Sequence, residues 1–248
     1  MTDARAYLLP GARIPQGNTV ILAAVPYFCG HTTGEISKYA RGLDYHRVLC
    51  KLFADAVNAA GAEDFCFATS TDVSPFREVA LAAAAGVGKI GENGLLLTER
   101  YGSYVFLGEI CGDFSGSVTP LREPLRCAGC GACKRACPTK GQGCLSEMTQ
   151  RRGELTAEEA DLMRRCQTAW GCDLCQDVCP ANRNAEKTKL PAFCEELVYR
   201  FDADELSALS NRAVERKYAD RAFIWRGGNV IKRNAMILHG SDADNARS

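Results

Sequence analysis

The chain has 248 residues, of which 46% are hydrophobic, so a sizeable core can be buried. Thirty basic residues balance thirty acidic ones, so net charge favours neither a nucleic acid nor another charged partner. The N-terminal segment holds no long apolar run behind a basic start, and no stretch reaches about 18 consecutive apolar residues. We therefore expect no signal peptide and no transmembrane helix, and a cytoplasmic protein with no membrane partner.

Strands and helices are expected to alternate in the first half of the chain. A short, branched, apolar run predicts a buried strand over residues 18–28. Apolar residues at helical spacing predict a helix over residues 44–61, with Asp44 at its start and Gly61 at its end. The elements expected after it are, in order, a strand over 63–69, an alanine-rich helix over 76–86 and a strand over 104–114.

The second half holds a cysteine-rich module and then turns helical after Pro191, where Asp202 and Glu205 form a capping pattern. The whole chain is therefore expected to be an α+β protein. Its expected domains are residues 1–120 with mixed α and β structure, residues 121–190 with the cysteines, and residues 191–248 with helices.

The cysteines indicate metal rather than disulfides, because the cytosol keeps thiols reduced. The run CAGCGACKRACP places Cys127, Cys130, Cys133 and Cys137 in front of Pro138. This is the C-x2-C-x2-C-x3-C-P arrangement of bacterial ferredoxins, in which the fourth cysteine binds the other cluster. A zinc site typically uses two separate C-x2-C pairs. The pattern favours iron–sulfur clusters over zinc.

A second run, GCDLCQDVCP, supplies Cys172, Cys175 and Cys179 but lacks a third closely spaced cysteine. Cys144 is the natural substitute, and Cys166 is its rival. Crossing the ligands as ferredoxins do predicts two complete sets for two [4Fe-4S] clusters. These sets are Cys127, Cys130, Cys133 and Cys179 for the first cluster, and Cys137, Cys144, Cys172 and Cys175 for the second.

The remaining cysteines are scattered among apolar neighbours. Free cysteine behaves as a small hydrophobic residue and is often buried. We therefore expect structural roles for Cys29, Cys50, Cys66, Cys111, Cys166 and Cys194.

Several segments resemble the epoxyqueuosine reductase family. They are ISKYARGLDYHRVL at residues 36–49, the long segment from STDVSP to FLGEI at residues 70–110, CLSEMT around Cys144, and the two cysteine runs, the second continuing as CPANR. They occur in the family's order and cover roughly residues 18–240. The resemblance implies a nitroreductase-like corrinoid-binding catalytic domain at residues 1–120, similar to that of reductive dehalogenases, followed by a ferredoxin-like domain with two [4Fe-4S] clusters.

The resemblance also implies base-off cobalamin, held without a protein histidine on cobalt. In the family the segment AGVGKIGENG lies near the corrinoid, so Gly88, Gly91 and Asn93 are candidate binding residues. The alternative for this segment is a plain turn between a helix and a strand. His46 is a further candidate for contact with substrate or cofactor, against the alternative of a histidine that is only packed or solvated.

The reaction implied by the resemblance is reduction of the epoxide of epoxyqueuosine, at the wobble position of tRNA, to the alkene of queuosine. Electrons pass from an external donor of the flavodoxin or ferredoxin type through the clusters to cobalt. The family's D-x-x-P motif makes Asp72 the implied proton donor. A carboxylic acid does this best when an apolar site raises its pKa toward neutrality. The alternative is an aspartate that forms a turn or caps the following helix.

Some features depart from the family pattern. We expect a short form without the C-terminal HEAT-like repeats that help bind tRNA, and Lys89, Glu92 and Ala181 stand where the family usually has other residues. The basic stretch over residues 211–233 has two interpretations. It either binds phosphates or forms a solvated helix face. Two alternatives to the reductase remain open: an electron carrier with two clusters, and an activator that reduces cobalt on a partner protein.

Overall fold

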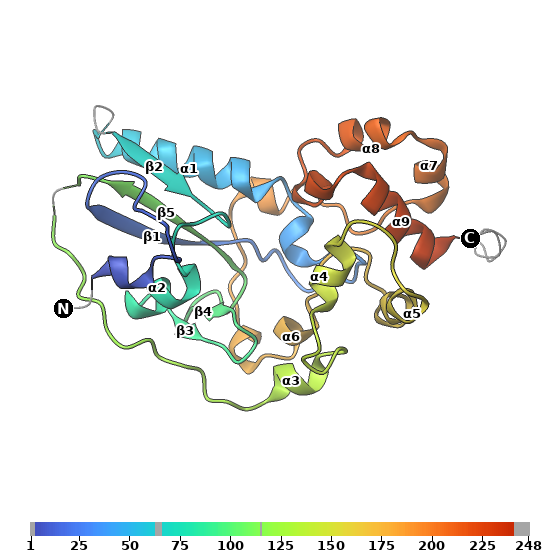
Figure 1. Ribbon diagram of the computed structural model, residues 1–248, viewed down its shortest axis with the longest axis horizontal. Coiled ribbons are helices and arrows are strands. Elements are labelled where there is room, and N and C mark those ends of the chain that lie inside the picture. The colour runs from blue at the N-terminus through green and yellow to red at the C-terminus, as the bar shows by residue number, and fades with distance from the viewer. Residues whose placement is uncertain (1–2, 63–65, 115, 241–248) are drawn as a thin grey trace. The chain divides into compact units, whose positions relative to one another are not determined.

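A computed structural model describes residues 3–62, 66–114 and 116–240 (Figure 1). The mixture of helices and sheet confirms a mixed α and β fold. Contacts divide the chain into two compact units, and each is assembled from separated parts of the sequence. The three consecutive domains expected above, with their nitroreductase-like and ferredoxin-like assignments, stay predictions. The first unit comprises Met1–Phe28, Tyr45–Gly131 and Cys179–Thr188, and the second comprises Cys29–Asp44, Ala132–Val178 and Lys189–Ser248.

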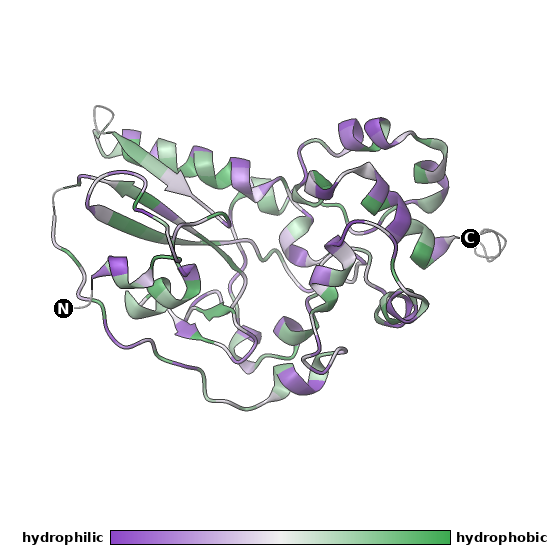
Figure 2. Cartoon of the chain, in the orientation of Figure 1, coloured by the Kyte–Doolittle hydropathy of each residue, from purple (hydrophilic) through white to green (hydrophobic). Residues whose placement is uncertain are grey.

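An antiparallel sheet in the order β1-β5-β2 forms the centre of the first unit. Its strands are β1 (Thr19–Pro26), β2 (Phe67–Ser70) and β5 (Val105–Gly112). The first and third expected strands are confirmed. The second is seen as β2, while residues 63–65 of its expected span lie outside the described residues. Figure 2 shows β1 and β5 largely in hydrophobic colours, as a sheet between two helices requires.

Two helices cover opposite faces of this sheet, and both confirm the predicted spans closely. They are α1 (Tyr45–Ala59) and α2 (Glu78–Ala84). Successive side chains of β5 point to opposite faces. The Phe106 ring stacks on Tyr45 of α1, with centroids 4.3 Å apart, whereas Leu107 packs with the buried alanines of α2. The buried side chains of α1 recur at helical spacing and are Tyr45, Leu49, Phe53 and Val57.

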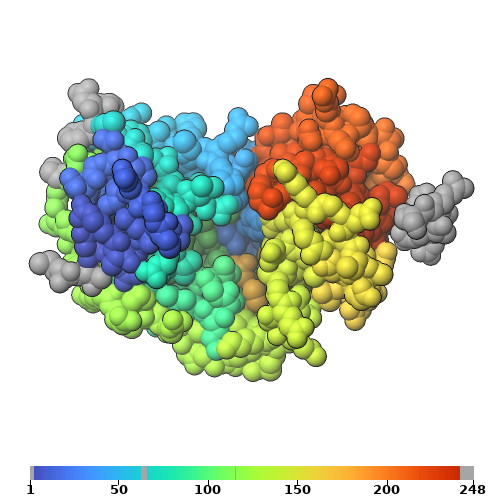
Figure 3. Space-filling view, viewed as in Figure 1, coloured from blue at the N-terminus to red at the C-terminus, as the bar shows by residue number. Residues whose placement is uncertain are grey.

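Small elements complete the first unit. A two-stranded hairpin of β3 (Lys89–Ile90) and β4 (Leu96–Leu97) follows α2 and was not expected from the sequence. The 3-10 helix η1 (Ala4–Tyr7) packs against α2, and the space-filling view shows this N-terminal segment in dark blue on the surface (Figure 3). A further 3-10 helix, η3 (Pro180–Asn182), follows the last Cys-Pro pair.

The second unit consists of short helices around an aromatic core. Trp170 and Phe223 are 0% exposed and Phe201 is 1% exposed. The helical character after Pro191 is confirmed, and the Asp202 side chain caps a helix there by accepting from the Glu205 N–H at 3.0 Å. Within the described residues, no helix has both the length and the apolar character needed to cross a membrane. The helices are η2 (Lys38–Ala40), α3 (Ala132–Ala136), α4 (Leu145–Gln150), α5 (Ala157–Cys166), α6 (Leu174–Asp177), η4 (Pro191–Phe193), α7 (Ala203–Ala208), α8 (Asn211–Lys217), η5 (Ala222–Arg226) and α9 (Gly228–His239).

Candidate functional site

Asp72 lies in a tight loop between β2 and α2. Its φ of +62° is in the left-handed region, which aspartate adopts more readily than most residues. The Val73 N–H donates to the Thr71 carbonyl at 2.7 Å, and the Thr71 hydroxyl donates to the Leu107 carbonyl of β5 at 2.8 Å. Asp72 therefore sits in a turn anchored on the central strand. Arg77, not Asp72, stands at the N-cap of α2, so the helix-cap alternative is wrong.

The start of α1 provides the groups that face the Asp72 side chain. The Tyr45 hydroxyl donates to Asp72 Oδ2 at 3.0 Å, and His46 Nε2 lies 3.5 Å from the same oxygen. Stacking of Tyr45 on Phe106 holds its ring in place. The Asp72 carboxylate itself is 63% exposed, so it is open to a substrate. The structure thus brings the candidates Asp72 and His46 together. It adds Tyr45, which the sequence analysis missed although Tyr45 directly precedes His46 in the segment ISKYARGLDYHRVL.

Two further glutamates lie on the α2 face of the sheet, and with Asp72 they form what we call the carboxyl cluster (Asp72, Glu78 and Glu109). Glu109 of β5 is 0% exposed; it accepts from the Ser70 hydroxyl at 2.7 Å through Oε2, while Oε1 has no hydrogen-bond partner. Burial raises the pKa of Glu109, against the Ser70 and Ser74 hydroxyls.

Glu78, at the start of α2, has its pKa raised from the ordinary value of 4.5 to about 7. The largest cause is burial, followed by the charges of Glu109 and of Asp72, and the Asp72 backbone N–H acts in the opposite direction. The sequence analysis missed Glu78 and Glu109. The available signal was a single glutamate inside the apolar strand segment YVFLGEI, at Glu109.

The glycine-rich segment forms the β3–β4 hairpin. The Gly91 N–H donates to the Leu95 carbonyl at 2.8 Å, and Asn93 Oδ1 accepts from the Leu95 N–H at 3.3 Å. A Cβ on Gly88 would stand 2.5 Å from the Leu97 carbonyl oxygen, and one on Gly91 would overlap Asn93 Oδ1. The hairpin by itself therefore accounts for both glycines. Binding of a corrinoid by Gly88, Gly91 and Asn93 stays a prediction.

Two cysteines of the first predicted set are anchored in the first unit. The Cys127 N–H donates to the Ile90 carbonyl of β3 at 3.0 Å. Cys179 precedes η3, whose Asn182 is 2% exposed. Asn182 Oδ1 accepts from the Ser103 N–H at 2.8 Å, and its Nδ2 donates to the Ser103 hydroxyl at 2.9 Å. The CPANR motif thus carries an internal anchor. Because the set also includes a cysteine assigned to the second unit, its grouping stays a prediction.

All four cysteines of the second predicted set belong to the second unit. Cys137 follows α3, and its sulfur lies 3.2 Å from the Thr139 hydroxyl. That hydroxyl, followed by the backbone N–H groups of Gly141, Thr139 and Lys140, lowers the pKa of the Cys137 thiol. Donors that converge on a sulfur favour the thiolate, which is the form that binds metal.

The Cys172 thiol lies close to two other members of the same set. Burial raises its pKa to about 12, and charges on Cys175, Asp173 and Cys144 act in the same direction. Helix α3 packs against α6, so the chain segment that ends at Cys137 lies beside the one that carries Cys175. The proximity of Cys144 to Cys172 supports Cys144 as the fourth ligand, and the choice of Cys144 over Cys166 stays a prediction.

The arrangement of these thiols is compatible with a cubane cluster. Across residues 3–62, 66–114 and 116–240, no three His, Cys, Asp or Glu side chains are positioned to hold one metal ion. A [4Fe-4S] cluster does not require such convergence, because each of its cysteines binds a different iron. Iron would replace the proton of each thiol on binding. The neighbouring thiols and the N–H donors around Cys137 therefore fit the cluster predicted from the sequence.

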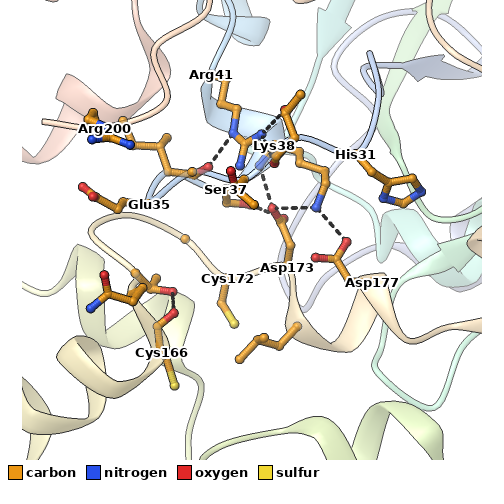
Figure 4. A pocket seen from close by; sticks show the side chains of 18 residues that line it. His31, Glu35, Ser37, Lys38, Arg41, Cys166, Cys172, Asp173, Asp177 and Arg200 are labelled. Carbon is orange, nitrogen blue, oxygen red and sulfur yellow. Dashed lines mark hydrogen bonds and ion pairs between the residues drawn. The ribbon is translucent and has the colours of Figure 1, made fainter.

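A cavity of about 500 Å³ in the second unit lies beside the Cys172 loop (Figure 4). The Ser37 hydroxyl donates to Asp173 Oδ1 at 2.5 Å, and Lys38 donates to Asp173 Oδ2 from its backbone at 2.8 Å and from Nζ at 3.4 Å. The Lys38 and Asp173 side chains are 8% and 9% exposed. We call these three residues the Asp173 clamp. Gly171 has a φ of +72°, and a Cβ there would overlap Ser37. The clamp therefore fixes the turn that presents Cys172.

Several cations of the basic stretch at residues 211–233 are used inside the protein. Lys217 pairs with Glu205, and Arg221 is only 7% exposed. Lys232 Nζ and the Arg233 guanidinium donate to backbone carbonyls, and burial lowers the pKa of Arg233. These four side chains therefore have structural roles. This argues against phosphate binding by this part of the stretch.

The six cysteines outside the predicted cluster sets, for which we expected structural roles, differ in their burial. Cys111 is buried at 1% exposure, as expected. Cys50 and Cys66 are exposed, so burial does not account for them and their structural role stays a prediction. Cys50 directly follows the buried Leu49 on α1, and neighbouring positions on a helix point about 100° apart, which turns its side chain away from the core.

The chain is similar to curated epoxyqueuosine reductases, although no model of a protein family matches it. The enzyme of Lactococcus garvieae is 34% identical over 227 residues, which cover 85% of this chain and 63% of the relative. That of Atelocyanobacterium thalassa is 34% identical over 245 residues, covering 90% of this chain and 78% of the relative. That of Bacillus subtilis is 32% identical over 273 residues, and the match covers 68% of the relative.

Solved structures of the same enzyme also match. The one from Streptococcus thermophilus has a TM-score of 0.69 and 30% identity, covering 88% of this chain and 62% of that protein. A complex with an epoxyqueuosine-modified tRNA-Tyr stem loop has a TM-score of 0.73 and 28% identity. A Bacillus subtilis structure, with a TM-score of 0.71, is described as having its aspartate catalytic loop swung out of the active site. The chain spans 62% of the length of each of these three proteins.

Proposed function

Because the chain belongs to the epoxyqueuosine reductase family, we propose that it is an oxidoreductase that reduces the epoxide of epoxyqueuosine in tRNA to an alkene. The observation that carries the proposal is the Asp72 loop, which holds an exposed carboxyl group against Tyr45 and His46 on a rigid sheet. Loss of the epoxide oxygen as water needs an acid at that oxygen while the C–O bonds break. Asp72 is the catalytic acid of this proposal.

The residues around Asp72 orient and solvate its carboxyl group. The Tyr45 hydroxyl donates to Oδ2 and leaves Oδ1 to face a substrate, while His46 adds a second polar group at Oδ2. The left-handed turn and the Thr71 anchor keep the side chain in this position. An acid held in place in this way needs no reorganisation when the reaction begins.

The proposed cofactors are two [4Fe-4S] clusters, held by the two cysteine sets, and base-off cobalamin. When bound, they supply the low-potential electrons that the reduction consumes. The proposed corrinoid-binding residues are Gly88, Gly91 and Asn93, within a catalytic domain at residues 1–120. The clusters would lie in a ferredoxin-like domain at residues 121–190. An external flavodoxin or ferredoxin would donate the electrons, in the cytoplasm.

The internal use of Lys217, Arg221, Lys232 and Arg233 favours a second candidate function. A chain with fewer free cations for phosphates would suit a two-cluster electron carrier, or an activator that reduces the corrinoid of a partner protein, better than a tRNA enzyme. These candidates predict bound iron without reduction of tRNA.

The test begins with anaerobic purification in the presence of cobalamin, followed by iron and cobalt analysis and a visible spectrum. The proposal expects about eight irons and about one cobalt per chain, with a base-off spectrum. The loaded protein is then reduced and mixed with tRNA that carries epoxyqueuosine, and the nucleosides are measured by mass spectrometry. Queuosine should appear. Full iron with no cobalt and no queuosine would contradict the proposal and support the electron carrier.

A further inference from the structure

We propose that Glu78 supplies the second proton of the reduction by reloading the Asp72 carboxyl group, with Glu109 keeping it protonated. The inference deepens the proposed function and rests on it. Conversion of an epoxide to an alkene and water consumes two electrons and two protons. The Asp72 carboxyl holds one proton at a time, so a second proton must reach the same oxygen from elsewhere.

The position of Glu78 follows from the sheet. Ser70 of β2 is the register partner of Glu109 on β5, and Glu109 points to the face that α2 covers. Glu78 opens α2, and the Asp72 backbone N–H is directed at its carboxylate. The loop that presents Asp72 therefore has Glu78 on its inner side. The proposed proton route runs from Glu78 to Asp72 across this loop.

Neither glutamate has the partners that a buried carboxylate ion needs. Oε1 of Glu78 and Oε1 of Glu109 are both buried without a hydrogen-bond partner among the described residues. Glu109 is fully buried, and hydroxyl groups alone assist it. An ionised carboxylate in such a site is costly unless a cation or several donors compensate it. The site therefore disfavours ionisation of both glutamates at once, so that one of the pair keeps a proton.

The charges around Glu78 support the same conclusion. Among the titratable groups on the elements packed against Glu78 and on its flanking residues, Glu109 and Asp72 are the ones that shift the pKa of Glu78. Their charges both raise this pKa, and burial raises it more. The value of about 7 places the proton at Glu78 within reach of exchange at neutral pH. The titratable groups on η1, β3, β5 and the flanking residues are Arg5, Tyr7, Lys89, Glu109, Cys111, Asp72 and Arg77.

A simpler role for Glu78 is an acidic residue in the first turn of α2, where the helix dipole favours a carboxylate. That role requires the ionised form and an ordinary or lowered pKa. The observed burial, the unpartnered Oε1 and the nearby Glu109 all act against ionisation. With seven residues, α2 also has a small dipole. The helix-start role therefore does not account for the site.

One proton is transferred with the cleavage of each of the two C–O bonds. The Asp72 carboxyl group gives its proton to the epoxide oxygen as the first C–O bond breaks, and becomes a carboxylate. The Glu78 carboxyl group then protonates Asp72. Asp72 passes this second proton to the resulting hydroxyl group, which leaves as water when the second C–O bond breaks. The two electrons come from the reduced cofactors of the proposed function, and solvent reprotonates Glu78 after product release.

The test compares Glu78→Gln with Glu78→Asp and with Glu99→Gln, which alters an exposed glutamate near the hairpin. Single-turnover rates of the fully loaded chain are measured from pH 5.5 to 8.5. The wild type and Glu99→Gln should share a decline above about pH 7, set by Glu78. Glu78→Gln should be at least about tenfold slower at pH 6 and should lack that decline, and Glu78→Asp should recover a pH-dependent rate. A Glu78→Gln profile that matches the wild type would show that solvent delivers the second proton, and would overturn the inference.

A second measurement does not depend on turnover. Infrared spectra of the cluster-loaded full chain report protonated carboxyl groups. A carboxyl band that fades as the pH passes through about 7 should be absent in Glu78→Gln, and should fade at lower pH in Glu109→Gln, which removes a neighbouring negative charge. Absence of that band in the wild type would overturn the inference and leave the proposed function intact. A loaded wild type with this band but no epoxide reduction at any pH would instead refute the proposed function, and the proton route with it.

Discussion

The carboxyl cluster of the first unit and the second cysteine set of the other unit hold their reactive groups by different means. Asp72 and Glu109 are placed by a hydrogen-bonded sheet whose two faces are covered by α1 and α2. The cysteines are placed by loops and by α3 and α6, which have five and four residues. Helix α3 buries no residue, so little apolar surface stabilises that segment.

This difference predicts where the proposed clusters would contribute to folding stability. The packed core of the first unit positions the carboxyl cluster without any cofactor. The cysteine segment has a rigid element in the Asp173 clamp, and the proposed metal–sulfur bonds would stabilise its other loops. Loss of metal should therefore loosen the cysteine segment and leave the sheet of the first unit intact.

The largest effect is expected from the test of which cysteine, Cys144 or Cys166, is the fourth ligand of the second cluster. Cys144→Ser should lose about four of about eight irons, because it removes one ligand of the second cluster. Cys166→Ser is the matched control and should keep all of them. Iron analysis measures the loss, and hydrogen exchange should show faster exchange in α3 and α6 with unchanged protection in β1 and β5. Iron loss in Cys166→Ser with full iron in Cys144→Ser would exchange the two assignments.

Asp72→Asn tests the other region. The amide keeps the volume and the contact with Tyr45 but has no acidic proton to give. Single-turnover reduction should fall by about 100-fold or more, with iron content and melting temperature unchanged. Asp55→Asn, at an exposed position on α1, is the control and should retain the wild-type rate. An unchanged rate in Asp72→Asn would leave Asp72 as a turn residue only.

The Asp173 clamp should contribute stability without metal. Asp173→Ala leaves the Lys38 ammonium largely buried, with the half-exposed Asp177 at 2.7 Å as its remaining carboxylate, and should cost about 2–3 kcal/mol of unfolding free energy. Asp177→Ala should cost at most about 1 kcal/mol, because its carboxylate is 40% exposed. Denaturant unfolding of the metal-free chain measures both. Equal losses of unfolding free energy in the two variants would show that the burial of Asp173 adds nothing to the stability.

Glu78→Gln should show a smaller effect that depends on pH. The folded state raises the pKa of Glu78 from 4.5 to about 7, so the folded chain holds this proton to higher pH than the unfolded chain does. Wild-type stability is therefore undiminished below pH 4.5 and falls as the pH rises to about 7. The variant lacks this loss and should be more stable at pH 8 by on the order of 2 kcal/mol, after a discount for partial solvent access.

Melting temperatures at pH 4 and pH 8 measure this difference. The advantage of Glu78→Gln over the wild type should be close to zero at pH 4 and reach its plateau above about pH 7. An advantage of the same size at both pH values would mean that packing, rather than ionisation, distinguishes the two proteins. The exposed Glu99→Gln variant should show no pH-dependent difference from the wild type.

The amino-acid sequence by itself determined the main helices and the strands 18–28 and 104–114. It also predicted that the cysteines form two sets of cluster ligands. Helices and strands are readable because burial of one face imposes a local period on apolar residues. The cysteines are readable because ligands from one tight loop must stand at short, fixed spacings. The burial of Leu49, Phe53 and Val57 on α1 shows how reliable such a local pattern is.

Only the tertiary structure decided what surrounds Asp72. Tyr45, Glu78 and Glu109 come from three separate elements, and the register of β2 with β5 and the helices packed on the sheet bring them to one place. The same holds for the Asp173 clamp, whose Lys38 and Asp173 are 135 residues apart. No local period or spacing encodes such meetings, because they depend on long-range packing whose free energy is shared among many side chains.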